Sequence, residues 1–224
     1  MEIDFTPFFR KYEQLVVMAD EAFERVKKEY PLCVKCKIAC DDCCYALFDL
    51  SLIEAMYINY HFNRKFDGTI KENLLGNANT ADRKTYNIKR NAYRKWKDGK
   101  GEDEIFKEIA EEHIRCPLLN KQQRCDLYEY RPITCRLYGI PTAIGGKGHT
   151  CGISGFRKGE AYPTVNLDII HKKLYEISLE FVQAIESKHF KMADILVPLS
   201  MALLTVYDEE YLGLLPEKEE KEEE

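Results

Sequence analysis

Nine cysteines, gathered in two groups, constrain this 224-residue chain more than any other feature of its sequence. The first group places five cysteines between Cys33 and Cys44, and the second places four between Cys116 and Cys151. A chain of this length can build a hydrophobic core without cysteine cross-links. Because the first group also lies in otherwise polar sequence, its cysteines do not look like small core residues, and a chemical role is indicated.

Metal binding explains these cysteines better than disulfide bonds do. Nine is an odd number, and the N-terminal sequence begins with acidic residues and lacks the long apolar run of a secretory signal. The longest apolar stretch, residues 193–207, is shorter than the roughly 20 residues that cross a bilayer. We therefore expect a cytoplasmic protein with no membrane span, whose thiols stay reduced.

Thiolates are soft ligands that select zinc, iron–sulfur clusters or Cu(I). A short-spaced pair can hold one metal from a tight turn while a distant segment supplies the other ligands. Eight thiolates would serve two tetrahedral zinc ions or cluster-type ligation, and the adjacent pair Cys43 and Cys44 could serve two metals or two edges of one centre. We predict eight metal ligands, with Cys33 as a substitute for the first: Cys36, Cys40, Cys43, Cys44, Cys116, Cys125, Cys135 and Cys151.

Two arginines, Arg131 and Arg136, flank Cys135 in the second group. Arginine beside a thiolate can donate a hydrogen bond to sulfur and offset negative charge, which is the role we predict for both. His149 lies two residues before Cys151 and could replace a cysteine as ligand, although a polar surface role is the commoner one.

The rest of the sequence predicts a mainly helical fold around a long irregular cysteine-rich region that metal organises. The spacing of apolar residues predicts helices over residues 5–28, 51–62, 81–96, 102–113, 167–187 and 193–207. Thr6 and Pro7 start the first helix as cap and first-turn proline, and Ser51 with Glu54 forms a capping box. Residues 66–80 predict a loop, and the Gly- and Pro-rich residues 115–164 predict the irregular region, with Gly145 and Gly146 as a flexible approach to Cys151.

We expect the helices and the cysteine-rich region to form one domain. Residues 1–32 form an N-terminal helix packing on the core, residues 33–165 the metal-binding part, and residues 166–215 the C-terminal helices that complete it. Residues 216–224 carry six Glu and two Lys and predict a disordered acidic tail, which accounts for most of the net charge of −5.

A basic segment, residues 83–100, interleaves Lys and Arg with Tyr86, Tyr93 and Trp96. This composition can bind nucleic acid. The sequence favours a solvated helix face opposite the acidic helix 102–113, so we do not expect a nucleic-acid partner; the protein or redox partner stays unknown.

The arrangement Cys36-x3-Cys40-x2-Cys43-Cys44 resembles the signature of the YkgJ-type cysteine cluster (CxxCxxCC) family, a zinc- or iron-chelating domain family. Two further elements are similar to that family: the run from Cys116 to Leu119, and the run from Arg124 to Arg136 that includes Tyr128-Glu129-Tyr130-Arg131-Pro132. Ser51 and Glu54 match the helix start that follows its double cysteine. Three residues, where the family has two, separate Cys36 from Cys40, which puts the first ligand in question.

The resemblance, over residues 36–151, implies metal chelation. We expect iron or an iron–sulfur cluster, with zinc as the alternative, in a redox or electron-transfer role. A structural zinc protein that binds a partner is a second expectation. Some family members are similar to flagellin lysine methylases, so a protein-modifying enzyme is a third, and whether the chain is an enzyme stays open.

Overall fold

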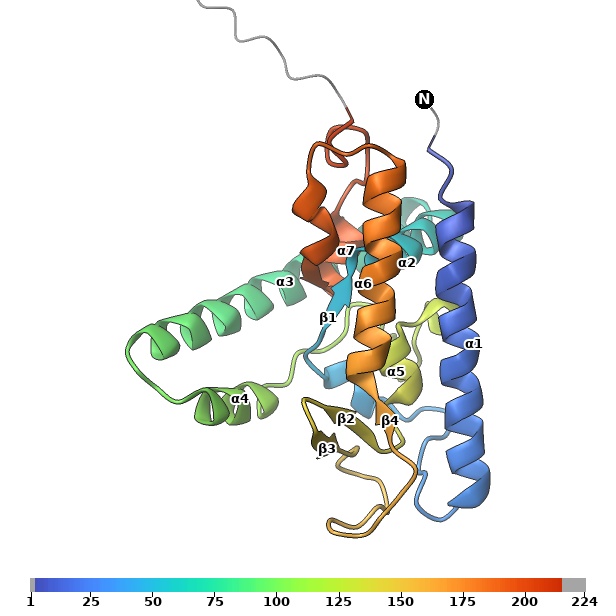
Figure 1. Cartoon of the computed structure of the whole chain (residues 1–224), viewed down its shortest axis with the longest axis vertical. Helices are drawn as coiled ribbons and strands as arrows, with labels where there is room; N and C mark the ends of the chain where they lie inside the picture. Colours follow the sequence, from blue (N-terminus) through green and yellow to red (C-terminus); the bar gives the residue numbers. More distant parts are fainter. Residues whose placement is uncertain (1–2, 215–224) are drawn as a thin grey trace, which may run out of the picture.

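The computed structural model describes residues 3–214 and is mainly helical, as predicted (Figure 1). This part of the chain contains seven α-helices, three 3-10 helices and five short strands. None of the helices in residues 3–214 is both long and apolar enough to cross a membrane. The acidic segment 216–224 lies outside the described residues.

The first helix, α1 (Thr6–Glu29), confirms the prediction to within one residue at each end. Phe9, Tyr12, Leu15, Ala19 and Val26 recur at helical spacing and form its buried face. This face packs against helices α2, α5 and α6. The predicted cap was wrong, because the N-cap position belongs to the residue before Thr6, and the Thr6 side chain makes no capping hydrogen bond.

Helix α2 (Leu52–Lys65) runs through the centre of the molecule and contributes to both apolar clusters of the core. Its start agrees with the prediction, but the capping box was wrong. The hydroxyl of Ser51 is buried without a hydrogen-bond partner, and Glu54 bonds elsewhere. A buried carboxylate needs partners, and here tertiary contacts supply them in place of the local backbone.

The predicted loop over residues 66–80 was wrong, because α3 runs without a break from Gly68 to Lys97. Gly and Asn lower the helix propensity of this segment. However, Leu74, Ala78, Ala81 and Thr85 fall on one buried stripe, and α3 packs along α7. Burial of this stripe outweighs the weak local propensity.

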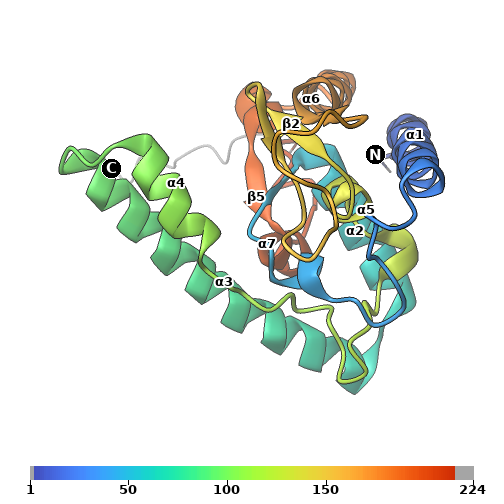
Figure 2. The ribbon, with the colours of Figure 1, turned by 90° about the horizontal axis from the view of Figure 1, so that it is seen from below.

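Helix α4 (Glu102–Ala110) turns back along the end of α3 and confirms the predicted acidic helix, although it ends three residues earlier. Lys95 and Lys100 both bind Glu108, at 2.7 and 2.5 Å. The second half of α3 and α4 together extend from the body as an antiparallel pair (Figure 2). We call this pair, residues 83–110, the arm.

The irregular region contains a 3-10 helix, η2 (Tyr128–Tyr130), a short helix, α5 (Ile133–Leu137), and a small sheet. Strands β2 (Thr142–Ile144) and β3 (Lys147–His149) form a hairpin, and β4 (Val165–Asn166) pairs in parallel with β2. Gly145 and Gly146 both have positive φ, so they form the tight hairpin turn instead of the predicted flexible approach to Cys151.

The C-terminal segment begins with α6 (Leu167–Ala184), close to its prediction. The long helix predicted over residues 193–207 was wrong: a 3-10 helix, η3 (Phe190–Asp194), precedes strand β5 (Leu196–Pro198) and the short helix α7 (Leu199–Leu204). Pro198 explains the break, because a proline disfavours helical backbone in the residue before it. That residue, Val197, pairs with Leu50 of strand β1 (Asp49–Ser51).

Two apolar clusters make up the core. One joins α1, α2, α5 and α6. The other joins α2, α3, α7 and β1, and Cys116 and Cys125 pack against it. The cysteine-bearing segments therefore rest on packed helices rather than on loops alone.

Candidate metal centre

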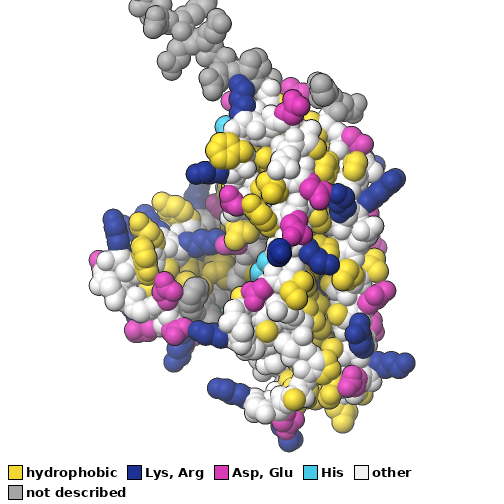
Figure 3. Space-filling model, in the orientation of Figure 1, with side chains coloured by type: hydrophobic (Ala, Val, Ile, Leu, Met, Phe, Trp, Pro, Cys, Tyr) yellow, Lys and Arg dark blue, Asp and Glu magenta, His cyan; other side chains and the backbone are white. Residues whose placement is uncertain are grey.

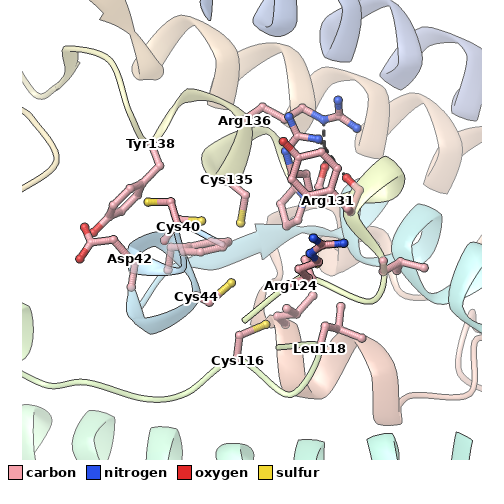
Figure 4. Close-up of a pocket in the computed structure, with 18 of the residues that line it drawn as sticks. Cys40, Asp42, Cys44, Cys116, Leu118, Arg124, Arg131, Cys135, Arg136 and Tyr138 are labelled. Carbon is pink, nitrogen blue, oxygen red and sulfur yellow. Dashed lines mark hydrogen bonds between the residues drawn. The ribbon is translucent and has the colours of Figure 1, made fainter. Parts of the chain in front are cut away.

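A cavity of about 700 Å³ collects the cysteines of both groups. The sulfur atoms of Cys135, Cys44 and Cys116 point into this space from three separate segments (Figure 4). Eight cysteines line the cavity, and they are the eight predicted from the sequence: Cys36, Cys40, Cys43, Cys44, Cys116, Cys125, Cys135 and Cys151.

The ninth cysteine, Cys33, does not line the cavity. Its amide donates to the carbonyl of Tyr30 at 3.0 Å, and its own carbonyl accepts from the amide of Gly155 at 2.8 Å. A Cβ at Gly155 would lie 3.0 Å from the Cys33 Cα, so the two backbones touch. Cys33 thus serves as a backbone contact between the two cysteine-bearing regions.

The double cysteine lies on a 3-10 helix, η1 (Asp42–Tyr45). Its two thiols are hydrogen-bonded to each other, and each has a different second partner. Hydrogen bonding to Cys135 is the largest cause that lowers the pKa of the Cys43 thiol. Hydrogen bonding to Cys44 likewise lowers the pKa of Cys116. The backbone strengthens this second pairing, because the Cys116 amide donates to the Cys44 carbonyl at 2.7 Å.

A compact turn presents Cys116 and Cys125 to the same side. The side-chain oxygen of Asn120 accepts from the amides of Gln122 and Arg124 at 2.9 and 3.0 Å. Its amide nitrogen donates to Asp126 at 2.7 Å. The side chain of Asn120 therefore organises the loop that separates the two cysteines, and burial raises the pKa of Cys125 to about 12.

Cys135 lies on α5, and the start of that helix is held by Glu54. The Glu54 carboxylate accepts from the Ile133 amide at 2.8 Å and from the Tyr12 hydroxyl at 3.1 Å. Burial raises the pKa of Glu54 to about 7. The sequence placed Glu54 only in a capping box, because its true partners are 42 and 79 residues away.

We call Cys43, Cys44, Cys116, Cys125 and Cys135 the inner group. We call the other three cysteines that line the cavity, Cys36, Cys40 and Cys151, the outer group. The Cys151 thiol donates to the Asp42 carboxylate at 3.1 Å. Burial raises the pKa of Cys36 to about 11, and the neighbouring Cys40 thiol adds to this rise. Sequence reasoning missed Gly139, which leaves room for Cys36: a Cβ there would lie 2.1 Å from the Cys36 sulfur.

The two predicted arginines also line the cavity. Arg136 donates to Asp20 at 2.6 Å, to the Arg131 carbonyl at 3.0 Å and to the Glu129 carbonyl. Arg131 lies over the Tyr128 ring, 4.0 Å from its centroid, and its charge helps to lower the pKa of Cys43. Arg136 therefore joins α1 to α5, while Arg131 supplies positive charge near the inner group. His149 is exposed on β3 and does not line the cavity.

The donor set suits a soft metal, because eight thiols line the cavity and outnumber the three carboxylates there, those of Asp20, Glu24 and Asp42. Within residues 3–214, no three His, Cys, Asp or Glu side chains already stand in the arrangement of a complete metal site. Hydrogen bonds instead connect four of the thiols to one another, in the order Cys135, Cys43, Cys44 and Cys116. Metal binding would replace these thiol–thiol contacts and release protons.

Comparison with known families gives one match: the model named CxxCxxCC, "Putative zinc- or iron-chelating domain", matches residues 33–152. This range begins at Cys33 and includes all nine cysteines. No curated protein and no solved structure shows significant similarity to the chain. The match supports metal binding in general and leaves the choice between zinc and iron open.

Proposed function

Because the chain belongs to the CxxCxxCC family, we propose that it binds iron at the inner group of cysteines, as an iron–sulfur cluster, and serves in electron transfer. The observation that carries the proposal is the convergence of eight cysteines from segments some 75 residues apart on one cavity. A cluster needs about four thiolates. The inner group offers this number with one to spare.

The surroundings of the inner group support a redox role. Cys125 packs against an apolar cluster, burial raises the pKa of Cys125 to about 12, and the charge of Arg131 helps to lower the pKa of Cys43. Burial, charge and hydrogen bonds to sulfur are the means by which a protein sets the potential of such a centre.

Anaerobic purification, metal and sulfide analysis, and an absorption spectrum test this proposal. We expect a coloured protein with stoichiometric iron and sulfide. Cys135→Ser should lose most of the iron, while Cys33→Ser, outside the cavity, should retain it. A colourless protein with stoichiometric zinc and no iron or sulfide would contradict the iron proposal.

The second candidate is a structural zinc site that presents a binding surface for a partner. It is supported by the position of the thiols, which lie on η1, the Asn120 turn and α5, three segments with little regular backbone pairing between them. Structural zinc contributes on the order of 10 kcal/mol to folding. A chelator should then lower the thermal midpoint sharply; an unchanged midpoint and circular dichroism spectrum after complete zinc removal would exclude this role.

A further inference from the structure

The arm carries an exposed stripe that neither the core nor the cysteine centre uses. Its members are Arg83, Tyr86, Arg90, Tyr93 and Lys97, all of them exposed. Tyr86 and Tyr93 keep 60% and 57% of their surface exposed, so both rings are accessible along the arm. The sequence alone did not show which face of α3 these rings occupy.

The spacing of the stripe is that of a helix-packing seam. Its residues are separated by three, four, three and four positions, so they lie along one line of α3 for about 21 Å. Positions with this alternation meet a second helix when two helices pack side by side. A straight line of this kind matches another helix better than it matches a flexible strand of nucleic acid.

The charge of the stripe specifies the chemistry of that second helix. Residues 83–97 contain no Asp or Glu. Among the described residues, Arg83, Arg90 and Lys97 form no ion pair, whereas Lys89 and Lys95 on other faces bind Asp49 and Glu108. Arg90 lies over the ring of Tyr86, 5.5 Å from its centroid, and Lys97 lies 5.9 Å from that of Tyr93.

The arm already shows how α3 binds an acidic helix. On another face, α3 packs against α4, whose Glu108 binds Lys95 of α3 and Lys100 of the connecting turn. Figure 3 shows Lys and Arg side chains beside hydrophobic ones on the arm. Tyrosine and arginine are also, with tryptophan, the residues most enriched where protein partners bind tightly.

We propose that the stripe docks an acidic amphipathic helix of a partner protein. Acidic side chains of that helix would face Arg83, Arg90 and Lys97, and its apolar side chains would cover Tyr86 and Tyr93. The proposal concerns the arm alone and does not depend on which metal the cysteines bind.

Fluorescence anisotropy with the full chain and two labelled synthetic helices tests the proposal. The first probe carries Glu and Leu at alternating three- and four-residue spacing, and its twin carries Lys in place of Glu. We expect the acidic probe to bind, the twin to fail, and added salt to weaken binding. The triple variant R83E/R90E/K97E should weaken binding of the acidic probe about tenfold or more, from three exposed charge contacts.

Two variants distinguish docking on the stripe from a non-specific electrostatic attraction between the acidic probe and the chain. The variant K84E/K158E/K188E makes the same change in net charge at exposed lysines off the stripe, and it should bind the acidic probe normally. The variant Y86A/Y93A keeps the charges and should weaken binding severalfold. Circular dichroism checks that each variant is folded.

Three outcomes would overturn the proposal. The first is the absence of specific binding: either the acidic probe does not bind the unmodified chain, or R83E/R90E/K97E and K84E/K158E/K188E bind that probe equally well. The second is tighter binding of a single-stranded oligonucleotide that the stripe variant abolishes, which would assign the surface to nucleic acid. The third is self-association of the unmodified chain that the stripe variant abolishes, which would assign it to a second copy.

Discussion

The carboxylate of Glu54 accepts a hydrogen bond from the backbone amide of Ile133 at 2.8 Å, so the first turn of α2 holds the first turn of α5. Cys135 follows Ile133 by two residues. The same carboxylate accepts from Tyr12 of α1 at 3.1 Å. One buried side chain therefore connects three helices at the edge of the cysteine centre.

Removal of this connection should destabilise the fold. We expect Glu54→Ala to lower the free energy of unfolding by about 2–4 kcal/mol, because it leaves the buried Ile133 amide and Tyr12 hydroxyl without an acceptor. Glu54→Gln keeps an acceptor oxygen and should cost less. Denaturant unfolding of both variants measures the difference, and equal losses would show that the hydrogen bonds of Glu54 do not matter.

The titration of Glu54 predicts a pH dependence. Burial raises its pKa to about 7 in the fold, whereas in the unfolded chain the carboxyl ionises near 4.5. Between these two pH values the Glu54 carboxyl is protonated in the folded chain and ionised in the unfolded chain. Its contribution to the free energy of unfolding is therefore full below about pH 4.5 and is lost as the pH rises to about 7. The whole change amounts to about 3 kcal/mol.

Glu54→Gln provides the control for this pH dependence, because glutamine does not titrate. We expect the variant to gain stability relative to the unmodified chain as the pH rises from 5 to 8. Unfolding free energies of both proteins across this range give the comparison. A constant difference between them would refute the proposed ionisation.

Gly139→Ala tests the place of Cys36. The new methyl group would lie 2.1 Å from the Cys36 sulfur and 3.2 Å from the Phe23 ring, so the thiol must turn away. Cys36 is one of the eight predicted ligands but lies outside the inner group, so we expect Gly139→Ala and Cys36→Ser to lose the same amount of metal, beyond the iron that the inner group binds. Gly152→Ala is the matched control, since its Cβ would meet nothing within 4 Å. Full metal content in Gly139→Ala, with a loss in Cys36→Ser, would show that the Cys36 thiol can shift and still bind.

Asn120→Ala should loosen the turn between Cys116 and Cys125. It removes one acceptor shared by two amides and one donor to Asp126, and we expect a loss of about 1–3 kcal/mol in stability. Cys125 should also react faster with a thiol-alkylating reagent, as measured by mass spectrometry. Asn79→Ala, exposed on α3, should change neither quantity.

Arg136→Ala should destabilise the chain by about 2–4 kcal/mol, because two backbone carbonyls and the Asp20 carboxylate lose a buried charged donor. Asp20→Asn should cost less than 1 kcal/mol, since Asp20 keeps 44% of its side chain exposed and exposed ion pairs contribute little. Thermal unfolding distinguishes the two. A loss of stability in Asp20→Asn as large as that in Arg136→Ala would mean that the ion pair, and not the hydrogen bonds to the carbonyls, holds α5 in place.

The sequence by itself determined the mainly helical class, the helices α1, α4 and α6, and the membership of the CxxCxxCC family. These features follow from the local periodicity of apolar residues and from the spacing of the cysteines, and both patterns can be read within a single segment of the sequence. The sequence also selected the eight cysteines that line the cavity and set Cys33 apart; their role as metal ligands stays a prediction.

Tertiary structure decided the features that depend on distant partners. Residues 68–80 became helical because α7 covers their small apolar stripe, and residues 196–198 became a strand because β1 pairs with them. Glu54 left its expected local cap for the Ile133 amide, 79 residues away. Such contacts offset the conformational entropy lost on folding only when the whole core forms, so the pattern of a single segment does not reveal them.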